Sequence, residues 1–168
     1  MLIRIAGTVN DSIVDGPGLR FTVFTQGCPH ACPGCHNPDT HDPQGGHDAD
    51  TDDLIAKMKK NPLLDGLTLS GGEPFVQPAP CIVLAQAARA QGLNVWAYSG
   101  FTYEELLAHP DPQVQELLLL CDVLVDGRFE LEQRSLELRF RGSRNQRLID
   151  LPATRAAGQV VCWAPPVW

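Results

Sequence analysis

The sequence has no run of apolar residues approaching the ~20 that a membrane-spanning helix needs, and residues 1–7 form no signal-peptide hydrophobic region. Positive charge is also scarce. The net charge of −7 argues against nucleic acid or an acidic membrane surface as a general partner. Internal repeats and low-complexity tracts are absent too. We therefore expect a cytoplasmic protein that binds neither nucleic acid nor membranes.

The chain of 168 residues is the size of one domain with one core, so we treat residues 1–168 as a single domain. Residues 41–53 are polar and are predicted to be a loop. The charged residues 128–144 are predicted to be a loop or a segment that orders only against a partner or ligand. Between them, short apolar strand-like stretches alternate with longer helical ones. We expect strands over residues 2–9, 20–25, 67–69, 93–98 and 123–125, further strands at 146–149 and 159–162, and helices over 52–60, 79–90, 103–108 and 113–120.

Such alternation is typical of α/β proteins with a parallel sheet and crossover helices. Eight βα units typically need ~250 residues, which is more than this chain provides. The sequence therefore predicts a partial (β/α) barrel or an open parallel sheet.

Three of the six cysteines, Cys28, Cys32 and Cys35, lie within eight positions in a C-x3-C-x2-C pattern. They follow the predicted strand at residues 20–25, so they lie on a loop at the carboxyl end of a strand. In a reducing compartment such a cluster indicates metal or redox chemistry. Full protein ligation of an iron–sulfur cubane takes four cysteines, so three leave one iron without a protein ligand. An open position of this kind is what a metal needs to bind a substrate.

A zinc site is the alternative, with His30, His36 or His41 as the fourth ligand of a Cys3His set. The chain would then be a non-enzymatic zinc or iron–sulfur binding module. The remaining cysteines form no second ferredoxin-like set, and we expect them to be small buried hydrophobes: Cys81, Cys121 and Cys162.

Polar motifs follow three later strands: Gly71-Gly72-Glu73, Tyr98-Ser99-Gly100 and Asp126-Gly127-Arg128. Paired glycines let the backbone approach a ligand closely, and a nearby carboxylate favours an ammonium group. Ligands of α/β proteins bind at the carboxyl ends of parallel strands. The sequence thus predicts that these motifs share one site with the cysteine loop.

The cysteine pattern, followed by these motifs in this order, resembles the radical S-adenosylmethionine superfamily. The resemblance implies a 4Fe-4S cluster, S-adenosylmethionine bound at the open iron, and reductive cleavage to a 5′-deoxyadenosyl radical, with no side chain as general acid or base. It implies that Cys28, Cys32 and Cys35 bind the metal. It also implies cofactor contacts from Gly34, Cys35, His36, Gly71, Gly72, Glu73, Ser99, Asp126 and Arg128.

Residues 15–20, Asp-Gly-Pro-Gly-Leu-Arg, resemble the V-D-G-P-G-x-R segment of glycyl-radical-enzyme activases. Residues 122–129 and 141–147 look like the branch that activates anaerobic ribonucleotide reductase, although Arg128 stands where lysine is usual and His36 where tyrosine is common. The resemblance implies that reductase as partner, with reduced flavodoxin or ferredoxin as electron donor.

Two other enzymes remain alternatives: an activase of another glycyl-radical enzyme, of the pyruvate formate-lyase type, and a radical enzyme like 7-carboxy-7-deazaguanine synthase. The arginine-rich residues 134–147 are expected to form a docking surface, or else a solvated basic face.

Overall fold

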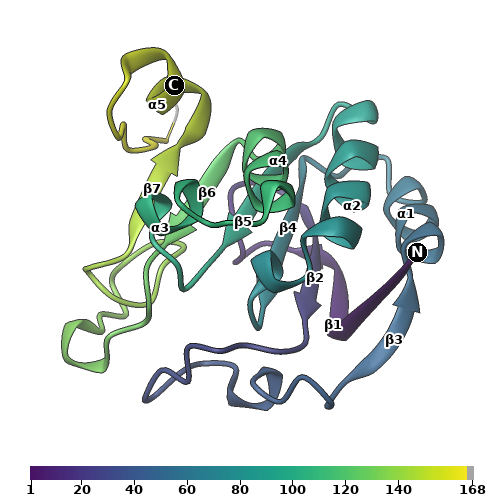
Figure 1. Cartoon of the computed structure of the whole chain (residues 1–168). Helices are drawn as coiled ribbons and strands as arrows, with labels where there is room; N and C mark the ends of the chain where they lie inside the picture. Colours follow the sequence, from purple (N-terminus) through teal and green to yellow (C-terminus); the bar gives the residue numbers. More distant parts are fainter. Residues whose placement is uncertain (166–168) are drawn as a thin grey trace.

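A computed structural model describes residues 1–165 of the chain, which form an open seven-stranded sheet of order β3-β1-β2-β4-β5-β6-β7 (Figure 1). The strands are β1 (Leu2–Ser12), β2 (Arg20–Thr25), β3 (His47–Asp50), β4 (Gly66–Gly71), β5 (Asn94–Tyr98), β6 (Val123–Asp126) and β7 (Arg147–Asp150). The helices are α1 (Thr51–Lys59), α2 (Pro78–Ala90), α3 (Tyr103–Leu107), α4 (Pro112–Leu120) and α5 (Leu151–Ala157), with short 3-10 turns at η1 (Pro38–Thr40), η2 (Pro74–Val76) and η3 (Leu131–Gln133).

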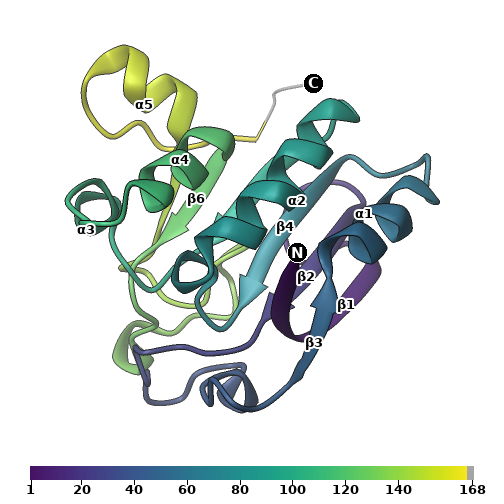
Figure 2. The ribbon, with the colours of Figure 1, turned by 45° about the vertical axis from the view of Figure 1, so that its right-hand side comes forward.

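The centre of the sheet is parallel, because β2, β4, β5 and β6 pair in one direction. Antiparallel strands flank it: β1 and β3 on one side and β7 on the other. Helices α1, α2 and α4 lie side by side across one face (Figure 2). The predicted fold class is therefore confirmed: an α/β partial barrel with a parallel sheet that does not close.

Burial explains this arrangement. Strands β4 and β6 are buried almost throughout, as expected for parallel strands whose two faces are both covered. Helix α2 turns Cys81, Leu84, Ala85 and Ala88 into the core, each with 0% exposure. Among the described residues no helix is long and apolar enough to cross a membrane.

Several sequence predictions were wrong in detail. Strand β3 lies inside the predicted loop 41–53; its polar sequence has no apolar alternation, and it forms only by pairing with β1. Residues 159–162 form no strand, only an isolated bridge between Ile149 and Cys162. Cys162 is exposed rather than buried, whereas burial of the two other cysteines is confirmed: Cys81 and Cys121.

Candidate functional site

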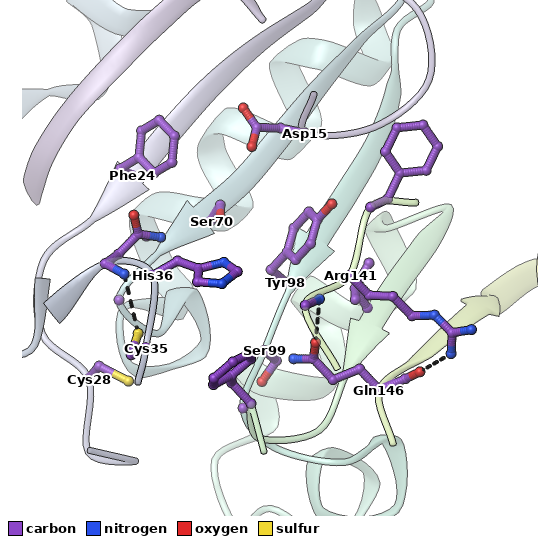
Figure 3. A pocket seen from close by; sticks show the side chains of 18 of the residues that line it. Asp15, Phe24, Cys28, Cys35, His36, Ser70, Tyr98, Ser99, Arg141 and Gln146 are labelled. Carbon is purple, nitrogen blue, oxygen red and sulfur yellow. Dashed lines mark hydrogen bonds between the residues drawn. The ribbon is translucent and has the colours of Figure 1, made fainter. Parts of the chain in front are cut away.

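A cavity of about 720 Å³ opens at the carboxyl ends of the parallel strands. Four segments supply most of its wall: the end of β1 with the loop after it (residues 9–15), the cysteine loop (residues 28–37), the ends of β4 and β5, and the segment of residues 127–146. Figure 3 shows the sulfur atoms of Cys28 and Cys35 on one side, with Tyr98 and Ser99 across from them. Motifs distant in sequence therefore meet around one space, as the parallel topology predicts.

The three clustered cysteines are free, half-buried thiols, and all three line the cavity. Burial raises the pKa of Cys28, and a hydrogen bond from the backbone amide of His30 lowers it by a smaller amount. The backbone amide of Asn37 donates to the sulfur of Cys35 at 3.4 Å. Amide donors of this kind stabilise thiolate ligands and tune a bound iron–sulfur cluster.

The glycine pair after β4 lets two stretches of backbone touch. A Cβ on Gly71, whose φ is +95°, would lie 2.5 Å from the amide nitrogen of Thr25. One on Gly72 would lie 2.4 Å from the carbonyl oxygen of Gly27. Only glycine fits at either position. The pair therefore lets the end of β4 pack against the backbone that leads into the cysteine loop, and both glycines line the cavity.

Glu73 is fully buried and does not line the cavity. Its carboxylate accepts hydrogen bonds from Ser99 Oγ at 2.9 and 3.0 Å and from the Gly100 amide at 2.8 Å. The Phe75 amide donates at 3.1 Å, and His30 Nε2 lies 2.6 Å away. Groups of the protein itself therefore use the hydrogen-bond acceptor positions of the Glu73 carboxylate.

Asp126 and Arg128 also lie outside the cavity lining. Asp126 is 1% exposed and accepts hydrogen bonds from the Tyr103 amide at 2.8 Å and from Nε of Arg147 at 3.1 Å. Arg128 is exposed, and its nearest carboxylate is that of Glu105 at 3.8 Å. A buried carboxylate needs a partner, and β7 supplies one because its register places Arg147 opposite Asp126.

Of the remaining predicted residues, some line the cavity and others do not. Ser99 and His36 line the cavity, and the His36 ring packs on Phe129 with centroids 5.1 Å apart. Gly34 does not line it; a Cβ there would lie 2.8 Å from the side chain of Leu131. The structure thus brings Cys28, Cys32, Cys35, His36, Gly71, Gly72 and Ser99 together around the cavity. Four predicted residues do not line it: Gly34 and Arg128, which are exposed, and Glu73 and Asp126, which are buried.

Sequence reasoning missed the role of Arg20, which is fully buried. Its guanidinium donates to the carbonyl of Pro17 at 2.9 Å and to Thr68 Oγ1 at 2.7 Å, and Thr68 donates in turn to the carbonyl of Asp15 at 2.9 Å. Burial lowers the pKa of Arg20 to about 10. Arg20 thereby fixes residues 15–18, so that Asp15 lies at the cavity wall.

Tyr98, part of a motif predicted to share the site, also lines the cavity, whereas Arg141 was missed as a cavity residue. Burial raises the pKa of Tyr98, so its phenol stays neutral. Of the described residues that line the cavity, Arg141 alone carries a fixed positive charge, and it donates to the carbonyl of Gln146. Nothing in the sequence distinguishes Arg141 from its neighbouring arginines.

The donor set fits an iron–sulfur cluster with three protein ligands. The other three cysteines lie elsewhere, and a cubane takes one thiolate per iron rather than gathering them on one ion. Across residues 1–165 no three His, Cys, Asp or Glu side chains form a single-ion site. His41 lines the cavity with a buried Nε2 that has no hydrogen-bond partner among the described residues, so this atom is free to meet a ligand.

Comparisons with known proteins agree with this chemistry. Residues 14–149 match the family described as "4Fe-4S single cluster domain". The anaerobic ribonucleoside-triphosphate reductase-activating protein of Vibrio cholerae is 39% identical over 142 residues, which cover 80% of this chain and 89% of the relative. The pyruvate formate-lyase-activating enzyme of Clostridium pasteurianum is 38% identical over 129 residues, 71% of this chain and 52% of that protein. The crystal structure of QueE from Escherichia coli is a distant likeness, with TM-score 0.47 and 17% identity over 61% of this chain and 54% of that one.

Proposed function

Since the chain belongs to the family of anaerobic ribonucleoside-triphosphate reductase-activating proteins, within the 4Fe-4S single cluster domain family, we propose that it is an activase. Its reaction is the reductive cleavage of S-adenosylmethionine at a 4Fe-4S cluster, which generates a glycyl radical on an anaerobic ribonucleotide reductase. One observation carries this proposal: Cys28, Cys32 and Cys35 line a cavity at the strand ends, and the other three cysteines lie elsewhere.

The three thiols would hold the cluster, which when bound supplies the electron that splits S-adenosylmethionine into methionine and a 5′-deoxyadenosyl radical. The cavity of about 720 Å³ is within the usual size range of small-molecule sites. We propose that the backbone of Gly71 and Gly72, with Ser99, binds the methionine end, and that His36 packs against the adenine. Apolar wall residues exclude water from the reactive carbon: Val9, Phe24, Phe129 and Phe140.

The carboxylate of S-adenosylmethionine needs a cation. The resemblance assigns it, with the ribose, to Asp126 and Arg128, which lie outside the cavity wall in this structure. Arg141 does line the cavity, and a guanidinium binds a carboxylate through its planar fork. We therefore propose Arg141 as the residue that meets the ligand's carboxylate.

The anaerobic reductase is the partner we propose, because the relative named for it is matched over 89% of its length, against 52% for the formate-lyase relative. Reduced flavodoxin or ferredoxin is the proposed electron donor, in the cytoplasm, where thiols stay reduced. Three exposed arginines on the segment of residues 127–146 make no ion pair within the described chain and suit docking to an acidic protein surface: Arg134, Arg139 and Arg144.

The test is electron paramagnetic resonance on the anaerobically reconstituted protein mixed with an anaerobic ribonucleotide reductase, S-adenosylmethionine and dithionite. We expect a glycyl-radical doublet, lost in Cys32→Ala and retained in the exposed-cysteine control Cys162→Ser. A doublet only on pyruvate formate-lyase would reassign the partner. A colourless protein with one tight zinc ion and no doublet would contradict the proposal.

A further inference from the structure

His30 lies between two of the clustered cysteines in sequence and lines the same cavity, and its side chain, which is 3% exposed, meets Glu73. Its Nε2 lies 2.6 Å from Oε1 of that carboxylate, which is itself fully buried. The amide and hydroxyl groups around this carboxylate use it as an acceptor, and the imidazole tautomer with its hydrogen on Nε2 would add a further donor. Hydrogen bonds to an ionised group are short and about twice as strong as neutral ones.

The Glu73 carboxylate collects donors from three places. Ser99 Oγ and the Gly100 amide come from the end of β5, and the Phe75 amide comes from η2 after β4. Of the described donors, His30 is the one that comes from the cysteine loop. Two carboxylate oxygens offer about four acceptor positions, and these contacts use them. Glu73 therefore joins the cysteine loop to the ends of β4 and β5.

The imidazole of His30 also fits its surroundings closely. A Cβ on Gly100 would lie 2.2 Å from His30 Cδ2, so only glycine leaves room for the ring. The ring of Phe101 meets the imidazole edge-on with centroids 4.6 Å apart. His30 also stands two residues after Cys28 and two before Cys32, so a fixed imidazole restrains the backbone that carries both thiols. A single residue thus ties the backbone between two proposed metal ligands to the buried carboxylate.

We propose that His30 is a positioning residue that, through Glu73, holds Cys28 and its loop in fixed register with the strand ends that bind S-adenosylmethionine. This inference rests on the proposed function and gives Glu73 the role of an anchor for the loop. A misplacement of about 1 Å at a reacting centre can cost roughly 100-fold in rate. Loosening this anchor is therefore expected to weaken the binding and cleavage of S-adenosylmethionine in addition to any loss of stability.

The experiment measures 5′-deoxyadenosine formed by the reconstituted chain with dithionite, without a partner enzyme, as S-adenosylmethionine is varied. It compares wild type, His30→Ala, His30→Gln, Glu73→Gln and the double variant His30→Ala/Glu73→Gln. His47→Ala is the matched control, because His47 is exposed on β3. Iron content and the electron paramagnetic resonance spectrum of the reduced cluster, with and without S-adenosylmethionine, are recorded for each protein.

For His30→Ala we expect a KM for S-adenosylmethionine raised about 10-fold or more, in line with the cost of misplaced reacting groups. Its spectrum with S-adenosylmethionine should change, while its iron content matches that of His47→Ala. His30→Gln, whose amide can donate to Glu73, should recover part of the loss. The double variant should be no worse than the worse single variant, because both changes remove one shared contact.

An active wild type together with wild-type KM and spectrum in His30→Ala would overturn this inference alone, as would fully additive effects in the double variant. If His30→Ala takes up no iron, His30→Gln decides: an intermediate KM supports the inference, and an unchanged KM overturns it. A reconstituted wild type that forms no 5′-deoxyadenosine would overturn the proposed function and this inference with it.

Discussion

Glu73 and Asp126 occupy matching places at the carboxyl ends of two parallel strands, β4 and β6, and both carboxylates are almost completely buried, with exposures of 0% and 1%. Their partners differ. Glu73 meets His30 from the cysteine loop, whereas Asp126 meets Arg147 from the antiparallel strand β7, and Arg147 also pairs with Glu104. Burial obliges each carboxylate to find a partner. The element that supplies the partner decides what the carboxylate stabilises: the cysteine loop in the case of Glu73, and the edge of the sheet in the case of Asp126.

The largest difference is expected from Glu73→Ala. This change leaves four buried donors without an acceptor, each worth about 1–3 kcal/mol when unsatisfied. We expect the free energy of unfolding to fall by about 4 kcal/mol or more in urea titrations, and cleavage of S-adenosylmethionine to be lost. A fall below about 1 kcal/mol would mean that Glu73 is not the junction described above.

Asp126→Ala should separate stability from cofactor binding. It removes the acceptor of the Tyr103 amide and of Arg147, but Arg147 is partly exposed and keeps Glu104, so we expect a loss of about 2–3 kcal/mol. The KM for S-adenosylmethionine should stay within about 3-fold, less than one hydrogen bond to a charged group would cost. A rise beyond 10-fold in the cleavage assay would instead support the ribose and carboxylate contact that the family resemblance implies.

Substitutions of two arginines test which cation meets the carboxylate of S-adenosylmethionine. Arg141→Ala removes the fixed cation of the cavity wall, and a charged hydrogen bond of about 1.5–3 kcal/mol corresponds to a 10- to 100-fold weaker affinity for S-adenosylmethionine. Arg128→Ala removes an exposed side chain whose pair with Glu105 is worth about 0–1 kcal/mol, so affinity and stability should scarcely change. Equilibrium binding measured by calorimetry compares the two variants, and the reverse ranking would restore Arg128 to the site.

The smallest expected effect is on the stability of the fold at acidic pH, through Glu104. A hydrogen bond from Arg147 is the main cause that lowers the pKa of Glu104 below its ordinary value. A lowered folded pKa means that the folded state binds the proton less readily, so this stabilisation is present above the ordinary pKa of about 4.3 and is lost as the pH falls through the folded value. Glu104→Gln should therefore flatten the acid limb of stability measured by urea unfolding below about pH 5. An unchanged acid limb would show that the exposed pair contributes nothing.

Features that depend on neighbours in sequence were predictable, and those that depend on distant partners were not. The cysteine loop follows β2, Gly71 ends β4 with Gly72 next to it, and Ser99 follows β5, so parallel topology alone brings them together. The orientation of Glu73 depends on His30, 43 positions away in sequence, and no local pattern records that contact.

The formation of strand β3 and the orientation of the Asp126 carboxylate likewise depend on partners that are distant in sequence. The polar residues of β3 become a strand only because the edge of β1 pairs with them. Asp126 turns toward Arg147, 21 positions later, because β7 runs antiparallel beside β6. In both cases tertiary pairing overrides what the local sequence indicates.

The central claim is that three cysteines leave one iron open for S-adenosylmethionine. It is tested most directly by electron paramagnetic resonance of the reduced, anaerobically reconstituted protein before and after S-adenosylmethionine is added. The account predicts a cluster signal whose line shape changes on addition, together with formation of 5′-deoxyadenosine. A signal unaltered by saturating S-adenosylmethionine, or a protein that holds one zinc ion and no iron, would contradict it.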